Sequence, residues 1–181
     1  MRKKNIILVG FMGVGKTAVI DELNKLYPDY RKVDTDELIV NIDERPISQI
    51  FEESGEDYFR TLETITLERV CREEFRIIAT GGGIVLKPEN RALLKMNGIV
   101  FWLNANPVVV YERIKDQKHR PLVDSSKSKV DVMVAISNLM IQRFDNYMQA
   151  SDIMINTDEL NIEQVAKAIY EEYERLKDCL I

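Results

Sequence analysis

Residues 10–17, Gly-Phe-Met-Gly-Val-Gly-Lys-Thr, fit the pattern G-x-x-x-x-G-K-[ST] and directly follow an apolar run at residues 6–9. A strand that leads through a glycine-rich loop into a helix is the setting in which this pattern cradles phosphates. Backbone N–H groups there surround phosphate oxygens, the lysine reaches the outer phosphates, and the hydroxyl residue can ligate magnesium. The pattern therefore predicts a nucleoside triphosphate site that uses Lys16 and Thr17. The alternative is a strand followed by a flexible turn.

Short apolar runs alternate with helical periodicity along the rest of the chain. The pattern predicts strands at residues 6–9, 31–33, 75–79, 99–103 and 153–155. Helices are expected at residues 15–26, 46–53, 56–73, 107–114, 130–150 and 161–177. Strands that alternate with helices indicate a parallel sheet covered on both faces, with ligands at the carboxyl ends of the strands. We therefore expect an α/β fold of the P-loop NTPase type, with three α/β/α layers and a five-stranded parallel sheet.

Length and charge restrict the architecture and the partners. A chain of 181 residues, 45% of them hydrophobic, can bury one core, so residues 1–181 are expected to form one domain. The 25 basic residues against 30 acidic ones give a net charge of -5, with no long basic run, so nucleic acid is not an expected partner. No exposed interface is evident in the pattern, and a monomer is expected.

Compartment is suggested by the cysteines and by the beginning of the sequence. Cys71 and Cys179 lack metal-ligand or redox spacing, which favours a reducing, cytoplasmic environment. Basic residues 2–4 precede an apolar stretch, as in a secretory signal, but residues 15–17 and the acidic pair at 21–22 replace any cleavage site. No apolar stretch approaches the roughly 20 residues of a membrane span, so no membrane association is expected.

Two further unusual segments follow predicted strands and therefore fall on the same edge of the sheet as the glycine loop. Asp34 and Asp36 follow the second strand, and if that segment stays extended both side chains leave the same face. One carboxylate could hold a magnesium-bound water or accept a hydroxyl proton while the other binds a polyol substrate. Alternatively, the aspartates cap the following helix. Gly81, Gly82 and Gly83 follow the third strand, where close approach to a ligand or a plain flexible loop would explain them.

Arginines on a helix and in a polar loop supply candidate anion-binding groups. Arg60 and Glu63 are three residues apart on one helical face, which favours a solvated ion pair but also suits a guanidinium that binds an anionic substrate. The loop at about residues 115–128 has the length and polarity of a mobile lid, and its Arg120 could neutralise charge on a transferred phosphoryl group. An exposed disordered loop is the alternative.

These motifs occur together in an order that resembles the shikimate kinase family, from about Asn5 to Ala150. The residues that carry the resemblance are Gly10 to Thr17, Asp34-Thr35-Asp36, Ile47 to Phe51, Gly55-Glu56, Phe59 to Glu63, Gly81-Gly82-Gly83, Arg120-Pro121-Leu122, and Arg143 with Tyr147. The resemblance implies transfer of a phosphoryl group from ATP to the 3-hydroxyl of shikimate, a step toward chorismate and the aromatic amino acids, with Mg²⁺ as cofactor.

The resemblance also implies roles for individual residues. Lys16, Asp34 and Arg120 would be catalytic, and Thr17 and Asp34 would hold the metal. The shikimate pocket would comprise Asp36, Arg60, Gly81, Gly82, Gly83 and Arg143. Asp36 and Arg60 belong to a substrate-binding helical segment at about residues 35–62, and the others follow it in the sequence. ATP would contact Gly13, Val14, Gly15, Lys16, Thr17, Ala18, Arg113 and Arg120, with Arg113 stacked on adenine.

The sequence departs from the family pattern directly after the glycine loop. The family shows Ser-Thr, a small residue and an arginine there, whereas Thr17 is followed by Ala18-Val19-Ile20-Asp21. This difference could alter how the adenine side or the α-phosphate is held. Two alternatives stay open: a related small-metabolite kinase such as a gluconate kinase, and a nucleotide-binding relative that has lost catalysis.

Overall fold

The computed structural model describes residues 4–116 and 128–177 of the 181-residue chain. Its centre is a five-stranded parallel sheet with strand order β2-β3-β1-β4-β5. The strands are β1 (Asn5–Val9), β2 (Arg31–Asp34), β3 (Arg76–Ala79), β4 (Gly98–Asn104) and β5 (Ile153–Asn156). The predicted α/β class and five-stranded sheet are therefore confirmed. Arg120 and residues 117–127 of the predicted lid lie outside the described residues.

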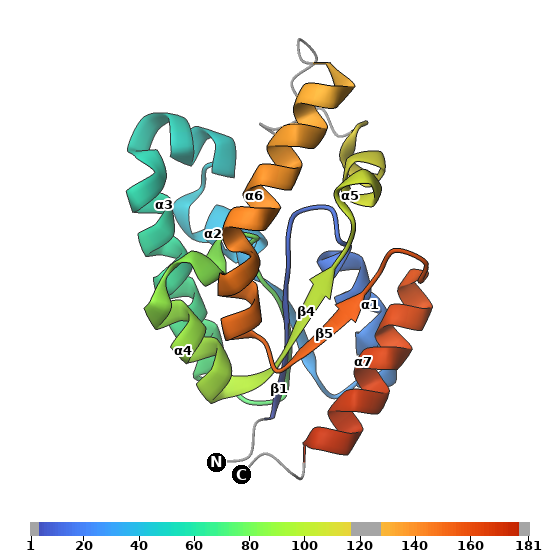
Figure 1. Ribbon diagram of the computed structural model, residues 1–181. Helices are drawn as coiled ribbons and strands as arrows, with labels where there is room; N and C mark the ends of the chain where they lie inside the picture. Colours follow the sequence, from blue (N-terminus) through green and yellow to red (C-terminus); the bar gives the residue numbers. More distant parts are fainter. Residues whose placement is uncertain (1–3, 117–127, 178–181) are drawn as a thin grey trace.

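Helices cover both faces of the sheet (Figure 1). The helices are α1 (Lys16–Leu26), α2 (Thr35–Asp43), α3 (Ile47–Cys71), α4 (Pro88–Asn97), α5 (Pro107–Ile114), α6 (Lys129–Ala150) and α7 (Ile162–Leu176), with a 3-10 turn at Ile84–Leu86. In Figure 1, α1 and α7 lie side by side on one face, and α3, α4 and the lower part of α6 lie on the other. Sequence patterning did not predict α2 and α4 as separate helices.

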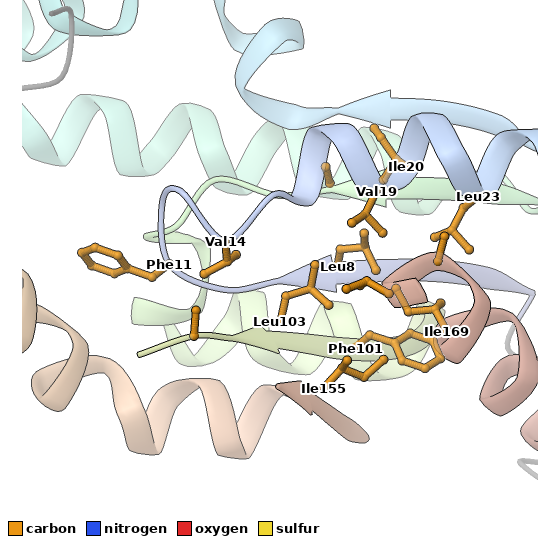
Figure 2. Packing of buried hydrophobic residues seen from close by; sticks show 14 of the residues in the cluster. Leu8, Phe11, Val14, Val19, Ile20, Leu23, Phe101, Leu103, Ile155 and Ile169 are labelled. Carbon is orange, nitrogen blue, oxygen red and sulfur yellow. The ribbon is translucent and has the colours of Figure 1, made fainter. Parts of the chain in front are cut away.

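Every residue of the central strand β1 is buried, which explains its unbroken apolar run. Alternate side chains enter two different cores. Ile6 and Leu8 pack with α1 and α7, whereas Ile7 and Val9 pack with α3, α4 and α6. Figure 2 shows the first core, where Leu8 of β1 packs in one cluster with Val19 and Leu23 of α1 and Phe101 of β4. Burial on both faces fixes the register of β1 and hence the position of the glycine loop that follows it.

The segment after β2 departs from the extended conformation considered above. The strand ends at Asp34, and α2 begins at Thr35. The Asp34 carboxylate accepts a hydrogen bond of 3.0 Å from the backbone N–H of Asp36, so Asp34 is the N-cap of α2. The extended interpretation was therefore wrong beyond Asp34, and the capping alternative is confirmed for Asp34 but not for Asp36, which lies in the first turn of α2.

Helix α3 contains a kink at Gly55, where φ is 81° and ψ is 173°. This backbone conformation is one that only glycine adopts readily, and it separates the helix into the two halves that the sequence predicted. The kink turns the half that begins at Ile47 relative to the half that carries Arg60. Among the described residues, no helix is long and apolar enough to cross a membrane.

Candidate active site

The glycine loop between β1 and α1 forms a tight, positively charged turn. Gly13 has a φ of 79°, and a Cβ atom there would lie 2.5 Å from the Ile114 side chain, so a larger residue would not fit. The ammonium of Lys16 donates to the carbonyls of Gly10 and Phe11 at 2.7 and 3.0 Å. Together with the N-terminus of α1, which begins at Lys16, these groups create a site suited to anions.

Thr17 and Asp34 meet at the base of this loop. The Thr17 hydroxyl donates to Oδ2 of Asp34 at 2.7 Å, while Oδ1 of the same carboxylate caps α2. Two oxygen-bearing side chains from different elements are thus held together beside the phosphate loop. Hydroxyl and carboxylate oxygens are the ligands that a hard divalent cation prefers, so this pair fits magnesium. The described residues contain no cluster of three or more His, Cys, Asp or Glu side chains that could hold a metal alone.

A cavity of about 600 Å³ opens over the loop and the first turn of α1. Gly13 to Ala18 of the loop line one side of it, and Asp34 and Asp36 lie at one end. Arg113 and the segment from Thr157 to Val165 form the opposite wall, and Arg113 donates to the Thr157 hydroxyl and carbonyl at 3.0 and 2.7 Å. The cavity has the position and the lining of a nucleotide pocket.

Sequence reasoning missed the contribution of Thr157 and the residues after it. These residues lie just after β5, at the same carboxyl edge as the glycine loop. Their position at the end of the fifth strand was the signal that could have identified them.

A second cavity of about 700 Å³ lies between α2, α3 and α6. Its polar side chains include Asp36, Arg60, Glu63 and Arg143, and the backbone of Gly81 to Gly83 forms part of the wall. Phe51 and Phe59 supply apolar surface, with the Arg60 guanidinium 6.0 and 5.4 Å from their ring centres. Two arginines, the acidic side chains of Asp36 and Glu63, and an apolar wall suit a small anionic polyol.

Arg60 is held in place by two carboxylates of its own helix. Its Nη1 donates to Glu63 at 2.6 Å, and its Nε and Nη2 donate to Glu56 at 3.1 and 2.8 Å. The predicted ion pair therefore exists, yet the Arg60 side chain is only 12% exposed and lines the cavity. The ion pair and a role in anion binding are thus compatible, because the carboxylates orient the guanidinium toward the cavity.

Glu63 is almost completely buried beside Arg60. Burial raises the pKa of Glu63 to about 7, because loss of hydration outweighs the attraction of Arg60, and the nearby Asp36 charge raises it further. The Oε1 atom of Glu63 is buried and has no hydrogen-bond partner within the described residues. The carboxyl group therefore titrates near neutral pH at the wall of the cavity.

The carbonyl of Gly82 receives two hydrogen bonds from α6. The Tyr147 hydroxyl donates to it at 2.6 Å and Nη1 of Arg143 at 3.3 Å. Tyr147 is buried and stacks on Trp102 with ring centres 5.6 Å apart, and burial raises the pKa of its hydroxyl to about 12. The tyrosine is thus neutral at pH 7 and remains a hydrogen-bond donor to the glycine segment.

Gly83 of the glycine segment approaches Arg60 so closely that a side chain at this position would force the guanidinium to move. A Cβ atom on Gly83 would lie 2.1 Å from Nη1 of Arg60. This close approach is to a protein side chain, and the expected close approach of the segment to a ligand stays a prediction. Thr80, which precedes the segment, donates its hydroxyl to the Leu8 carbonyl at 3.0 Å.

The two cavities meet at three residues. Met12, Asp36 and Gly82 line both of them, so a group bound over the phosphate loop would face a group bound between α2, α3 and α6 across Asp36. Except for Arg120, every residue predicted to bind ATP, metal or shikimate or to act in catalysis lies in the lining of one or both cavities. The arrangement suits direct transfer between two ligands.

Comparison with known proteins agrees with this arrangement. Residues 12–174 match the family model described as shikimate kinase. The sequence is 40% identical over 176 residues to the shikimate kinase of Thermodesulfovibrio yellowstonii, covering 97% of this chain and 98% of that protein. It is also 40% identical over 170 residues to the shikimate kinase of Caldicellulosiruptor saccharolyticus, covering 92% and 93% of the two chains. The chain belongs to the shikimate kinase family.

Solved structures show the same relationship. The fold matches Acinetobacter baumannii shikimate kinase in complex with shikimate with a TM-score of 0.87 and 31% identity, over 98% of this chain and 96% of that one. A gluconokinase from Sinorhizobium meliloti shares the fold alone, with a TM-score of 0.63 and 13% identity. The family prediction is therefore confirmed, and the fold is also that of a more distant small-metabolite kinase.

Proposed function

We propose that this chain transfers the γ-phosphoryl group of ATP to the 3-hydroxyl of shikimate, as its membership of the shikimate kinase family indicates. The observation that carries the proposal is the meeting of the two cavities at Asp36, one built on a phosphate loop and one lined by Arg60 and Arg143. Phosphoryl transfer depends on alignment and charge neutralisation more than on covalent catalysis. Two adjoining sites of this kind supply both.

On the nucleotide side, the backbone of Gly13, Val14 and Gly15 surrounds the phosphates, and Lys16 neutralises their charge. Thr17 and Asp34 would hold Mg²⁺, which when bound neutralises phosphate charge during transfer. The hydrogen bond between Thr17 and Asp34 supports this pairing, because it already brings the two oxygen atoms together. Ala18 borders the same cavity, and Arg113 lies where it could contact the adenine.

On the acceptor side, Arg60 and Arg143 bind the shikimate carboxylate, and the backbone of Gly81 to Gly83 completes the pocket. Asp36 binds substrate hydroxyls, since it lies where the two cavities join. Asp34, one residue before α2, helps to hold the metal and accepts the proton of the reacting substrate hydroxyl. We assign Arg120, outside the described residues, to the lid that neutralises the transferred phosphoryl group.

The whole chain, residues 1–181, is proposed to act as one domain and as a monomer. The exposed apolar side chains of α6, such as Val134, Ile141 and Met148, are where self-association would begin. Sedimentation equilibrium tests this point, and a concentration-dependent dimer would contradict it.

The experiment that tests the activity is ADP release from Mg-ATP by purified protein with shikimate, with gluconate or with no acceptor. We expect release only with shikimate. Lys16→Ala should reduce turnover by at least about 100-fold, because the charge that it supplies acts on the transition state. Gluconate-dependent release, or release that does not require an acceptor, would contradict the proposal.

A further variant separates the two sites. Arg60→Lys keeps the positive charge but loses the planar fork that binds a carboxylate through two hydrogen bonds. We expect its KM for shikimate to rise about tenfold or more while its KM for ATP stays unchanged. An equal rise in the KM for ATP would contradict the assignment of Arg60 to the shikimate pocket.

A further inference from the structure

A third cavity, which shares only Asp34 with the nucleotide cavity, lies along edge strand β2 between α2 and the end of α3. Its volume is about 500 Å³. Val33, Leu38 and Val70 belong to its lining and to the core cluster beneath it, so they give it an apolar floor. Arg31, Arg69 and Arg76 line the end nearest the beginning of β2. We call this cavity the β2 groove.

The three arginines come from three different elements. Arg31 of β2 and Arg76 of β3 are register partners in a parallel pair, so their side chains leave the same face of the sheet. Arg69 lies in the last turn of α3, which packs over that face. The Asn5 side chain accepts from the backbone N–H of Arg76 at 2.9 Å and donates to the Glu73 carbonyl at 3.0 Å, which fixes the loop between α3 and β3.

The positive charge of this cluster is only partly balanced. Glu73 forms an ion pair with Arg76, and the additional fields of Arg31 and Arg69 help to lower the pKa of Glu73. Within the described residues, Arg31 and Arg69 form no side-chain hydrogen bond or ion pair. Three guanidinium groups therefore surround the Glu73 carboxylate. The other charged residues of the lining are Asp34, Glu37 and Lys32, and Lys32 is paired with Asp21 outside the groove. At the arginine end of the groove the excess positive charge favours a bound anion.

Arg76 provides a second, independent observation. Its side chain is only 10% exposed, and its buried Nε–H has no acceptor within the described residues. A buried donor without an acceptor is costly, because it loses its hydration without gaining a hydrogen bond. An anionic oxygen that enters the groove beside Arg76 would remove this cost.

We propose that the β2 groove is a binding site for a small oxyanion, a carboxylate or a phosphate, held by Arg31, Arg69 and Arg76. A ligand with a compact apolar body would also cover Val33, Leu38 and Val70 on the floor. Of the groove residues, only Asp34 also lines the nucleotide cavity, so the site is distinct from the pocket that holds Arg60 and Arg143. The proposal does not depend on the acceptor that the enzyme uses.

The test must exclude anions that bind at the active site. The ¹⁵N-labelled full chain is therefore first saturated with Mg-ADP and shikimate, and then titrated separately with inorganic phosphate and with cyclohexanecarboxylate at constant ionic strength. Amide shifts are followed by NMR. We expect saturable shifts at Arg31, Arg69 and Arg76 with half-saturation near or below about 1 mM for at least one anion.

Matched variants decide whether the arginines are responsible. The exposed pair Arg31→Gln with Arg69→Gln should weaken binding about tenfold or more, since it removes two charge-assisted donors. Arg72→Gln is the control, because Arg72 is also exposed near the end of α3 but does not line the groove. Its binding should equal that of the parent chain.

The two titrations distinguish the source of the anion. Saturation by phosphate alone supports a phosphate site, and saturation by cyclohexanecarboxylate supports a carboxylate site that uses the apolar floor. The proposal is overturned if neither anion gives saturable shifts in the groove. It is also overturned if the double variant binds as well as the parent, or if Arg72→Gln weakens binding equally.

Discussion

At the scale of single residues, the hydrogen bond from Tyr147 to the Gly82 carbonyl is the contact that most directly positions the pocket wall. Tyr147→Phe removes this bond of 2.6 Å but keeps the ring stacked on Trp102. Because the Gly82 peptide also borders Arg143, we expect the KM for shikimate to rise about tenfold. Steady-state kinetics with varied shikimate measure the effect.

The control for this variant is Tyr173→Phe. Tyr173 is equally buried, but its hydroxyl faces Tyr30 and the Lys4 carbonyl, far from the cavities. It should lose about 1 kcal/mol of stability and keep the parent KM. If both variants changed the KM alike, the effect of Tyr147 would be general destabilisation instead of positioning.

Glu63 makes stability depend on pH. Its pKa of about 7 lies above the ordinary value of 4.5, so the folded state binds a proton more tightly than the unfolded state. The stabilisation is therefore complete below about pH 4.5 and is lost as the pH rises through 7, amounting to about 3 kcal/mol. Glu63→Gln should flatten this part of the pH profile.

Denaturant unfolding between pH 5 and pH 8 measures this dependence. Glu56→Gln is the matched control, since Glu56 also binds Arg60 but its side chain is 60% exposed. That variant should keep the slope of the parent protein. We expect the free energy of unfolding of the parent protein to fall between pH 5 and pH 7. A rise over this range that Glu63→Gln abolishes would contradict the raised pKa of Glu63.

At the scale of elements, the kink in α3 links backbone geometry to the acceptor pocket. Gly55 has a φ of 81°, and a side chain there meets no neighbour within 4 Å, so the cost of Gly55→Ala is backbone strain alone. We expect a loss of about 1–3 kcal/mol in stability. Because the kink sets Phe51 relative to Arg60, the KM for shikimate should rise as well.

Thermal unfolding and kinetics of Gly55→Ala test this link. Glu52→Ala, an exposed substitution three residues before the kink, is the control and should change neither quantity. A destabilised Gly55→Ala variant with an unchanged KM would show that the kink matters for folding but not for the pocket.

The element scale also shows where sequence patterning succeeds. All five strands and the glycine loop were predictable, because a strand buried on both faces leaves an unbroken apolar run such as residues 6–9. Helices α2 and α4 were not, since each buries only two residues and therefore leaves little periodic signal. The Asp34 cap was visible only as an alternative, because one carboxylate can serve both a cap and a ligand.

At the scale of the whole molecule, the site residues were predictable as a set but their contacts were not. Parallel strands bring the segments after β1, β2 and β3 to one edge, which is why Lys16, Asp34 and Gly81 could be grouped from order alone. The hydrogen bonds from Tyr147 to Gly82 and from Arg113 to Thr157 depend on how segments that are far apart in the sequence pack. Such contacts leave no local pattern.

The single-domain proposal and the two-pocket arrangement make one joint prediction for thermal unfolding. Residues 1–181 should unfold in one transition, and each ligand should raise its midpoint, because ligands stabilise only the state that binds them. At 100 times its Kd, a ligand contributes about 2.7 kcal/mol, which corresponds to roughly 5–10 °C in a chain of this size. Lys16→Ala should lose most of the shift with Mg-ADP but keep the shift with shikimate, and Arg60→Ala should do the reverse.

Two separate transitions would contradict the single domain. The two cavities share Met12, Asp36 and Gly82, yet we expect them to bind their ligands as distinct sites. Loss of both midpoint shifts in either variant would contradict this expectation.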